Sequence, residues 1–268
     1  MTTYIAPDAP LAARPASRIR QVATDRPWVW LAAGWRDLLA NPAIGLAYGG
    51  ALCVAGWVLA LLLFEAGALW AVLPATAGFF LVGPLVAAGL YEVSRLREQG
   101  RRASLADAML AYRRNGGQLA VLGMVLLVLH LFWVRIAGLL FMLFFGTEGL
   151  PALESLPMAM LRSDQLLPFL VIGTGFGFLL AAGSFAISAV SIPMLIERDI
   201  GALEAVTVSI QAVLENWRPM LLWAALIVVF TGLALVPFFL GLLVVLPLIG
   251  HATWHAYRDL VAPEPAAG

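Results

Sequence analysis

Six nearly uninterrupted apolar runs constrain this 268-residue chain more than any other feature. A helix needs about 20 apolar residues to cross the ~30 Å hydrocarbon layer of a bilayer, and its backbone must satisfy its own polar groups there. Charged residues make up only 12% of the chain, about half the fraction typical of soluble domains. We therefore expect an all-α polytopic helix bundle with six transmembrane helices in three hairpins. The predicted spans are residues 43–64, 68–93, 118–145, 166–195, 219–235 and 238–258.

The last two predicted spans form one continuous stretch from Pro219 to Tyr257. As a single helix this stretch would be about 58 Å long at 1.5 Å per residue, roughly twice the hydrocarbon thickness. Two helices joined by a tight turn near residues 232–237 fit the membrane better. This division gives an even number of spans and places both termini on the same side.

The distribution of arginine predicts which side that is. All sixteen basic residues are arginine, and the six-span arrangement places fourteen of them on one face. Only Arg162 lies on the opposite face, and Arg135 falls within the third span. Because basic residues concentrate on the cytoplasmic side of membrane proteins, we expect both termini to be cytoplasmic. The predicted organisation is a disordered cytoplasmic leader over 1–26, a single six-span domain over 27–261 and a flexible tail over 262–268.

A recurring pattern divides the six spans into three similar units. Segments with amphipathic character precede the outward-going spans, and we expect them to lie as helices along the cytoplasmic interface; they are residues 27–41, 104–115 and 200–217. All three end in an asparagine, namely Asn41, Asn115 and Asn216. The inward-going spans carry prolines that are expected to kink their helices: Pro84, Pro193 and Pro247. The recurrence suggests a parallel threefold internal repeat, although any six-span protein can be divided into three hairpins.

Five segments of the chain resemble one known family. They are GWRDLLANP (34–42), LVGPLVAAGLYE (81–92), SIPMLIERD (191–199), LLWAALIVV (221–229) and LPLIGHATWHAYRDLV (246–261). Together they resemble the bacterial integral membrane proteins grouped as domain of unknown function 2189, over roughly residues 27–261. The resemblance implies a multi-pass protein of the bacterial inner (cytoplasmic) membrane with the same architecture. It implies no activity and assigns no catalytic residues.

His251 and His255 are the main candidate ligands for a metal ion. They lie four residues apart on the sixth predicted span and so share one helical face, a spacing that can bind a metal through two imidazoles. His130 on the third span or Glu92 near the inner end of the second could supply a further ligand, and two histidines from different spans could hold haem. Alternatively, both histidines hydrogen-bond neighbouring groups near the inner headgroups. The cofactor is therefore unknown, with metal or haem as a hypothesis.

Polar residues within a span are costly and are candidates for function. His130 lies near the membrane midplane, where a buried hydrogen bond is the alternative to a functional role. Arg135 lies closer to the outer surface, and we expect a structural ion pair with Glu65 at the outer end of the first span.

Small residues recur at helical spacing on two spans and predict close helix packing. Gly45 and Gly49 lie on the first span, and Gly173 and Gly177 lie on the fourth. The sequence leaves open whether the packing partner belongs to the same chain or to a second one.

The sequence also narrows the class of function. It contains no P-loop, dinucleotide-binding fingerprint, GxSxG elbow or HExxH helix, so we do not expect an enzyme. A formal net charge of zero gives no basic surface for nucleic acid. We expect a non-enzymatic accessory, assembly or scaffold factor, with the handling of metal or haem as an added hypothesis. The alternative is a small-solute or ion transporter or channel with a path along the pseudo-threefold axis. The expected partners are the lipid bilayer and another membrane protein or a second copy of the chain.

Overall fold

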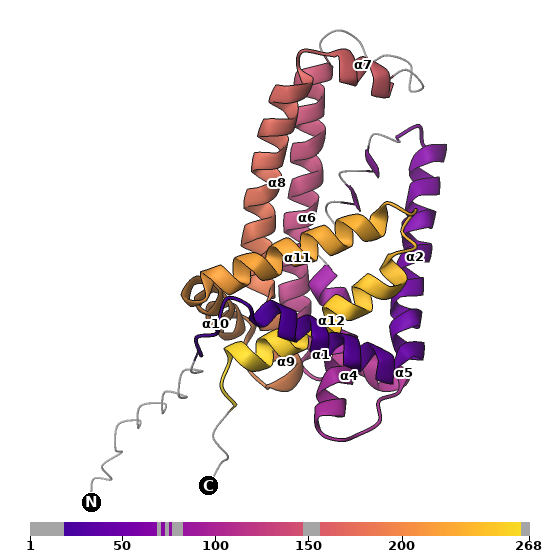
Figure 1. Cartoon of the computed structure of the whole chain (residues 1–268). Helices are drawn as coiled ribbons and strands as arrows, with labels where there is room; N and C mark the ends of the chain where they lie inside the picture. Colours follow the sequence, from indigo (N-terminus) through magenta and orange to yellow (C-terminus); the bar gives the residue numbers. More distant parts are fainter. Residues whose placement is uncertain (1–18, 69–70, 73–74, 77–82, 147–155, 264–268) are drawn as a thin grey trace, which may run out of the picture.

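The computed structural model describes residues 19–68, 71–72, 75–76, 83–146 and 156–263. Within these residues the regular elements are helices, and the one β-type contact is an isolated bridge between Ile19 and Val261. Figure 1 shows α6 (Gly116–Phe145) beside α8 (Leu166–Ser188), with α2 (Pro42–Glu65) standing apart from this pair. The predicted all-α class is confirmed for the described part of the chain.

The remaining helices connect or cross these three. α11 (Trp217–Leu235) and α12 (Leu242–Leu260) form a hairpin that runs obliquely across the view of Figure 1. At the lower end of the long helices lie the shorter ones: α1 (Arg26–Ala40), α4 (Ala88–Glu98), α5 (Leu105–Leu110) with the 3-10 helix η2 (Ala111–Arg113), α9 (Ser191–Glu197) and α10 (Ala202–Glu215). α7 (Leu156–Arg162) lies at the opposite end, next to α8.

Four helical stretches in the described residues are long and apolar enough to cross a membrane: Pro42–Glu65, Gly116–Phe145, Leu166–Glu197 and Trp217–Leu235. They correspond to the first, third, fourth and fifth predicted spans. Large apolar side chains on them are exposed, among them Leu139 and Leu143 of α6 and Leu167 of α8. Exposed apolar surface on this scale is typical of helices that face lipid. The multi-pass membrane nature of the chain is therefore confirmed.

The other two predicted spans differ from these four. Part of 68–93 lies outside the described residues, and its last residues form the start of α4. Residues 238–258 largely form α12, whose first half is apolar and whose second half carries His251, His255 and Arg258. Most of α12 is buried against other helices of the chain. The six-span count therefore stays a prediction.

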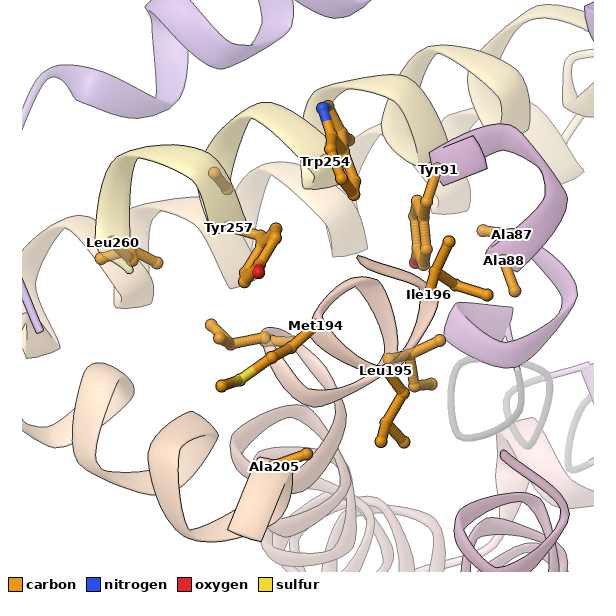
Figure 2. Packing of buried hydrophobic residues seen from close by; sticks show 14 of the residues in the cluster. Ala87, Ala88, Tyr91, Met194, Leu195, Ile196, Ala205, Trp254, Tyr257 and Leu260 are labelled. Carbon is orange, nitrogen blue, oxygen red and sulfur yellow. The ribbon is translucent and has the colours of Figure 1, made fainter. Parts of the chain in front are cut away.

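The hydrophobic core lies mainly among the short helices and includes only the adjoining ends of the long helices α6 and α11. Its largest fully buried side chains include Trp30, Trp223, Trp254, Tyr91 and Tyr257. Figure 2 shows Trp254 and Tyr257 of α12 facing Met194 and Ile196 of α9, with Tyr91 of α4 beside them. This distribution follows from the solvent, because helices that face lipid gain little by burying apolar side chains against one another. We call this packed layer of α1, α4, α5, α9, α10 and the second half of α12 the base.

Glycines allow α12 to approach α1 and α2 closely. A Cβ atom added to Gly49 of α2 would lie 2.6 Å from the carbonyl oxygen of Leu242, and one added to Gly34 of α1 would lie 2.6 Å from the backbone nitrogen of Ala252. Gly45 packs against Leu38 and Pro247. For Gly45 and Gly49 the structure thus answers the question that the sequence left open, since both pack against α12 of the same chain and Gly45 also packs against α1.

The second glycine stripe behaves differently. Gly177 of α8 faces the ring of Trp133, with 3.2 Å between the position of an added Cβ and the ring. No described atom lies within 4 Å of the position that a Cβ would take at Gly173. Within the described part of the chain, only one of the two predicted packing glycines on α8 therefore makes a close helix contact.

Each of the three prolines occupies a different local structure. Pro193 follows the break between α8, which ends at Ser188, and α9, which begins at Ser191. Pro247 lies inside α12, where it removes the backbone donor for the carbonyl of Leu243. Pro84 lies just before α4, and its carbonyl accepts a hydrogen bond from the hydroxyl of Tyr91 at 3.1 Å.

A side chain from α10 fills the break before Pro193. The hydroxyl of Ser209 donates to the carbonyl of Ala186 at 2.7 Å and accepts from the backbone N–H of Val190 at 3.1 Å. Val190 and Ala186 would be direct partners in an unbroken α-helix. An inserted side chain is one of the recognised causes of helix kinks, so the kink depends on α10 as well as on proline.

Replacing Ser209 with alanine should destabilise the protein by about 1–3 kcal/mol, because it leaves a buried backbone donor and acceptor without a partner. The free energy of unfolding in mixed detergent and sodium dodecyl sulfate measures this. Thr207→Ala is the matched control, since Thr207 is exposed on the same helix and its hydroxyl bonds only the carbonyl of Leu203. Equal effects of the two substitutions would contradict the assignment.

The folded domain begins earlier than the predicted boundary at residue 27. The backbone N–H of Arg20 donates to the carbonyl of Leu260 at 2.8 Å, and that of Val22 donates to the side chain of Asn216 at 2.9 Å. These contacts join the residues before α1 to the end of α12 and the end of α10. Of the predicted leader and tail, residues 1–18 and 264–268 lie outside the described residues.

Candidate functional site

The second half of α12 is the centre of a polar network in the base. Its side chains reach three other helices: His255 contacts α1, Trp254 contacts α4, and Tyr257 contacts α9. An amphipathic helix buried on several sides must satisfy each polar group that it buries. The contacts of α12 follow that rule, and they make its histidines part of a connected cluster.

The innermost part of this network joins two histidines through a carboxylate and a hydroxyl. Nε2 of His255 lies 2.8 Å from Oδ2 of Asp37, and Oγ of Ser94 donates to the same oxygen at 2.7 Å. Oγ of Ser94 also lies 2.8 Å from Nδ1 of His251. Nε of Arg97 lies 3.2 Å from the other carboxylate oxygen, Oδ1 of Asp37. We call His255, Asp37, Ser94 and His251 the histidine–aspartate cluster.

Asp37 is the anion of this cluster. Burial by itself raises the pKa of a carboxyl group, yet the hydrogen bonds from His255 and Ser94 outweigh it and hold the pKa of Asp37 below its usual value. Arg97 adds a cation on the opposite carboxylate oxygen. The ionised form of Asp37 is therefore favoured, and its two oxygens are occupied by donors from α4 and α12.

The hydrogen bonds also determine the tautomer of His251. Because the single hydroxyl proton of Ser94 is donated to Asp37, its oxygen accepts from Nδ1–H of His251. This leaves a lone pair on Nε2 of His251. The residue is fully buried, and Nε2 has no hydrogen-bond partner among the described residues.

Ion pairs surround the cluster. Arg258 contacts Glu197 at 2.8 Å and Glu98 at 3.2 Å, while the hydroxyl of Tyr257 donates to Glu197. Asp259 accepts from Nε of Arg26 at 2.8 Å and from the indole of Trp30 at 2.6 Å. Through these pairs the end of α12 is fixed to α1, α4 and α9.

A surface cleft of about 320 Å³ opens beside the cluster. His255 lines it together with Arg26, Trp30, Glu98 and Arg258. The side chain of His255 is 27% exposed, so this residue connects the cleft to the buried part of the cluster. Such a cleft is small for a drug-sized ligand but admits water and small ions.

The structure brings together only part of the predicted metal site. His251 and His255 share the cluster, but Glu92 instead pairs with Arg95 at 2.7 Å and with Arg114 at 2.9 Å. His130 lies on α6, where its Nδ1 is buried without a hydrogen-bond partner in the described region. Among the described residues, no three His, Cys, Asp or Glu side chains are grouped so that they could hold a metal ion. The geometry supports hydrogen-bonded roles for both α12 histidines.

The predicted ion pair at the outer surface does not form in the described structure. Arg135 of α6 and Glu65 at the end of α2 are both described, both are exposed, and they make no ion pair with each other. In Figure 1, α2 stands apart from α6 along their upper parts. Residues at matching depth in two spans can therefore lie on helices that do not touch.

Sequence reasoning missed Asp37, Ser94 and Asp259 as members of the site. Asp37 and Asp259 each lie in a segment that carries the family resemblance, GWRDLLANP and GHATWHAYRD. An acidic residue next to arginine on an otherwise apolar buried helix was the available signal, because a buried carboxylate requires partners. Ser94 gave no such signal, since a serine near the end of a helix is common in any environment.

Comparison with known proteins gives one match. No curated protein and no solved structure matches this chain. A family model described as "Predicted integral membrane protein (DUF2189)" matches residues 72–197, which include α4, α5, α6, α8 and α9. The matched segment is shorter than the resemblance over 27–261 and leaves out α1 and α12. Residues 72–197 of this chain are thus similar to the predicted integral membrane proteins grouped as domain of unknown function 2189.

Proposed function

We propose that this protein is a non-enzymatic accessory or scaffold factor of the bacterial inner membrane. The observation that carries the proposal is the contrast between the base and the long helices. In the base, charged side chains such as Asp37, Glu197 and Asp259 are paired within the chain. On α6 and α8, apolar side chains such as Leu143 and Leu179 are exposed. These charged side chains of the base are paired within the chain, and the long helices expose apolar side chains. Such exposed apolar helices can bind a partner protein within the membrane.

The proposed topology has six spans with both termini in the cytoplasm. The base carries most of the arginines described, including Arg26, Arg97, Arg114, Arg198 and Arg258. Residues 19 and 261, near the two ends of the described chain, pair with each other there. Positive charge and both chain ends on one side favour a cytoplasmic base.

Backbone geometry supports the proposed threefold repeat. The asparagines before α2, α6 and α11 share an uncommon conformation: φ −133° and ψ 53° at Asn41, φ −133° and ψ 52° at Asn115, and φ −114° and ψ 37° at Asn216. Two of them also make equivalent contacts with the segment before the next unit. Asn115 donates to the carbonyl of Ile200 at 2.9 Å, and Asn216 donates to that of Arg20 at 3.1 Å. Asn41 differs, because its amide contacts only its own helix.

The proposed interfacial position of α1, α5 and α10 is supported by their exposed side chains. Trp28 and Trp35 project from α1, and Leu203 and Leu214 project from α10. Tryptophan and leucine on one side of a short helix are typical of segments that lie at headgroup depth. Met109 is exposed on α5 in the same way.

The topology can be tested with two fusions at the C-terminus. Alkaline phosphatase is active only outside the cytoplasm, whereas green fluorescent protein exported unfolded stays dark. We expect low phosphatase activity and bright fluorescence in bacterial cells. High phosphatase activity with dark fluorescent protein would place the C-terminus outside and remove the basis of the six-span arrangement.

The scaffold role can be tested by photo-crosslinking in native membranes. A photoreactive residue at Leu179 on α8 should give a discrete protein adduct, while the same residue at Val229 on α11 serves as an exposed control. The competing candidate is a transporter, which the unpartnered buried Nδ1 of His130 favours. Lipid adducts alone at both positions, together with solute flux in proteoliposomes that His130→Ala abolishes, would replace the scaffold proposal with transport.

A further inference from the structure

The histidine–aspartate cluster contains two basic groups and one carboxylate that can neutralise them. Both imidazoles reach Asp37, His255 directly at 2.8 Å and His251 through the hydroxyl of Ser94. Arg97 already balances the charge of this carboxylate. A second cation in a buried cluster is costly unless a counter-charge is shared with it, so protonating both histidines together is unfavourable.

We propose that His255, Asp37, Ser94 and His251 form a site for a single proton, which either histidine can hold at the expense of the other. The ligand is the proton itself, and water in the cleft is its source. This inference goes beyond the scaffold role and does not depend on it.

Each histidine has a defined place for the additional proton. At His255, Nε2–H already donates to Asp37, so the proton is added to Nδ1, on a side chain that lines the cleft. At His251, Nδ1–H already donates to Ser94, so the proton is added to the unpartnered Nε2. An interaction with the backbone of Leu90 favours the protonated ring of His251. No other bond forms or breaks in either case.

Other charged groups set the balance between the two positions. Arg97 of α4 opposes the proton at His251, and Asp37 of α1 favours it there. Next to His255, the cleft adds Arg26 and Arg258 as cations and Glu98 and Asp259 as anions. The side chain of His255 is partly exposed and His251 is fully buried, so water reaches the pair from the side of His255.

Nitrogen-15 magnetic resonance of histidine side chains can test this, because the chain contains only three histidines. The shifts of the two ring nitrogens distinguish N–H from a bare lone pair, so they report tautomer and protonation directly. In the purified full-length protein we expect His251 to carry its proton on Nδ1 at neutral pH. As the pH falls, we expect one histidine of the pair to become protonated and the other to follow only at a lower pH. His130, which lies outside the cluster, is the internal reference.

Two variants give the decisive comparison. In His255→Gln the amide can still donate to Asp37 but cannot hold the proton, so His251 should become protonated at a pH higher by about 1 unit than in the unmodified protein. In Asp37→Asn protonation of His251 should require a pH lower by about 1 unit. Glu204→Gln, at an exposed position on α10 of the same base and away from the cleft, should change neither.

The result that overturns the proposal is equally specific. If His251 responds to pH identically with and without His255, the two imidazoles do not share a proton. If His251 carries its proton on Nε2 at neutral pH, the assigned tautomer is wrong and the site does not exist as described. The spread of the amide proton chemical shifts of each variant shows whether its fold is retained. If Asp37→Asn fails to fold, Ser94→Ala removes the hydroxyl that joins His251 to Asp37 and tests the same connection.

Discussion

Gly49→Leu should abolish stable folding of this protein in detergent, with a loss of at least about 3 kcal/mol. The reason is steric and cannot be relieved by a side-chain rotation. A Cβ at Gly49 would lie 2.6 Å from the carbonyl oxygen of Leu242 and 2.6 Å from Cα of Leu243. These are backbone atoms of α12, and α12 is also fixed to α1 at Gly34. Accommodating a leucine therefore requires α2 and α12 to separate.

Gly173→Leu is the matched control for this experiment. It makes the same chemical change in another apolar helix, at a position where no described atom lies within 4 Å of the added Cβ. Leucine has a better helix propensity than glycine by somewhat under 1 kcal/mol, so the control should fold as well as the unmodified protein. Size-exclusion elution and the midpoint of thermal unfolding measure both. Similar losses in the two variants would show that the α2–α12 contact does not hold the fold together.

This pair of glycines also marks how far the sequence predicts packing. The spacing of Gly45 and Gly49 and that of Gly173 and Gly177 are the same, and both predict a surface for close approach. Only the three-dimensional arrangement shows that Gly49 meets the backbone of α12 while Gly173 meets no described atom. A local pattern identifies a surface that can be approached, but the identity of its partner depends on the path of the whole chain.

The helices themselves could be located from the sequence, because hydropathy, proline and capping act over a few residues. The predicted segments 27–41 and 200–217 correspond to α1 and α10, and Ser104 forms a capping box with Asp107 at the start of α5. The break before Pro193 was also predictable as a kink. The hydroxyl of Ser209 that completes it was not, because nineteen residues separate it from Val190 and no local rule joins them.

The candidate site shows the same limit. His251 and His255 could be selected from the sequence because ionisable residues are rare within apolar segments. Their partners could not, since Asp37 lies 218 residues before His255 and Ser94 lies 157 residues before His251. Without those partners the pair resembled a metal site. With them, its donors are engaged in hydrogen bonds that link three helices.

Asp37→Ala should be the most damaging single change in the base, with a loss of about 3 kcal/mol in the free energy of unfolding. Removing one partner of a buried ion pair typically costs 3–5 kcal/mol, because it leaves an uncompensated charge. The lower end applies here, since the side chain of Arg97 is 38% exposed and water can replace part of the lost interaction. The substitution also leaves the hydroxyl of Ser94 and Nε2–H of His255 without their acceptor.

Glu98→Ala provides the comparison that isolates burial as the cause. Glu98 accepts from Arg258 at 3.2 Å and from the indole of Trp254 at 3.2 Å, but its side chain is 43% exposed. Water can replace these bonds in part, and exposed ion pairs contribute at most about 1 kcal/mol. Unfolding titrations of both variants at neutral pH should therefore differ by about 2 kcal/mol or more, with Asp37→Ala the less stable. A loss in Asp37→Ala no greater than that in Glu98→Ala would mean that the cluster does not join α1, α4 and α12. Such a result would leave the packing at Gly34 and Gly49 as the main attachment of α12.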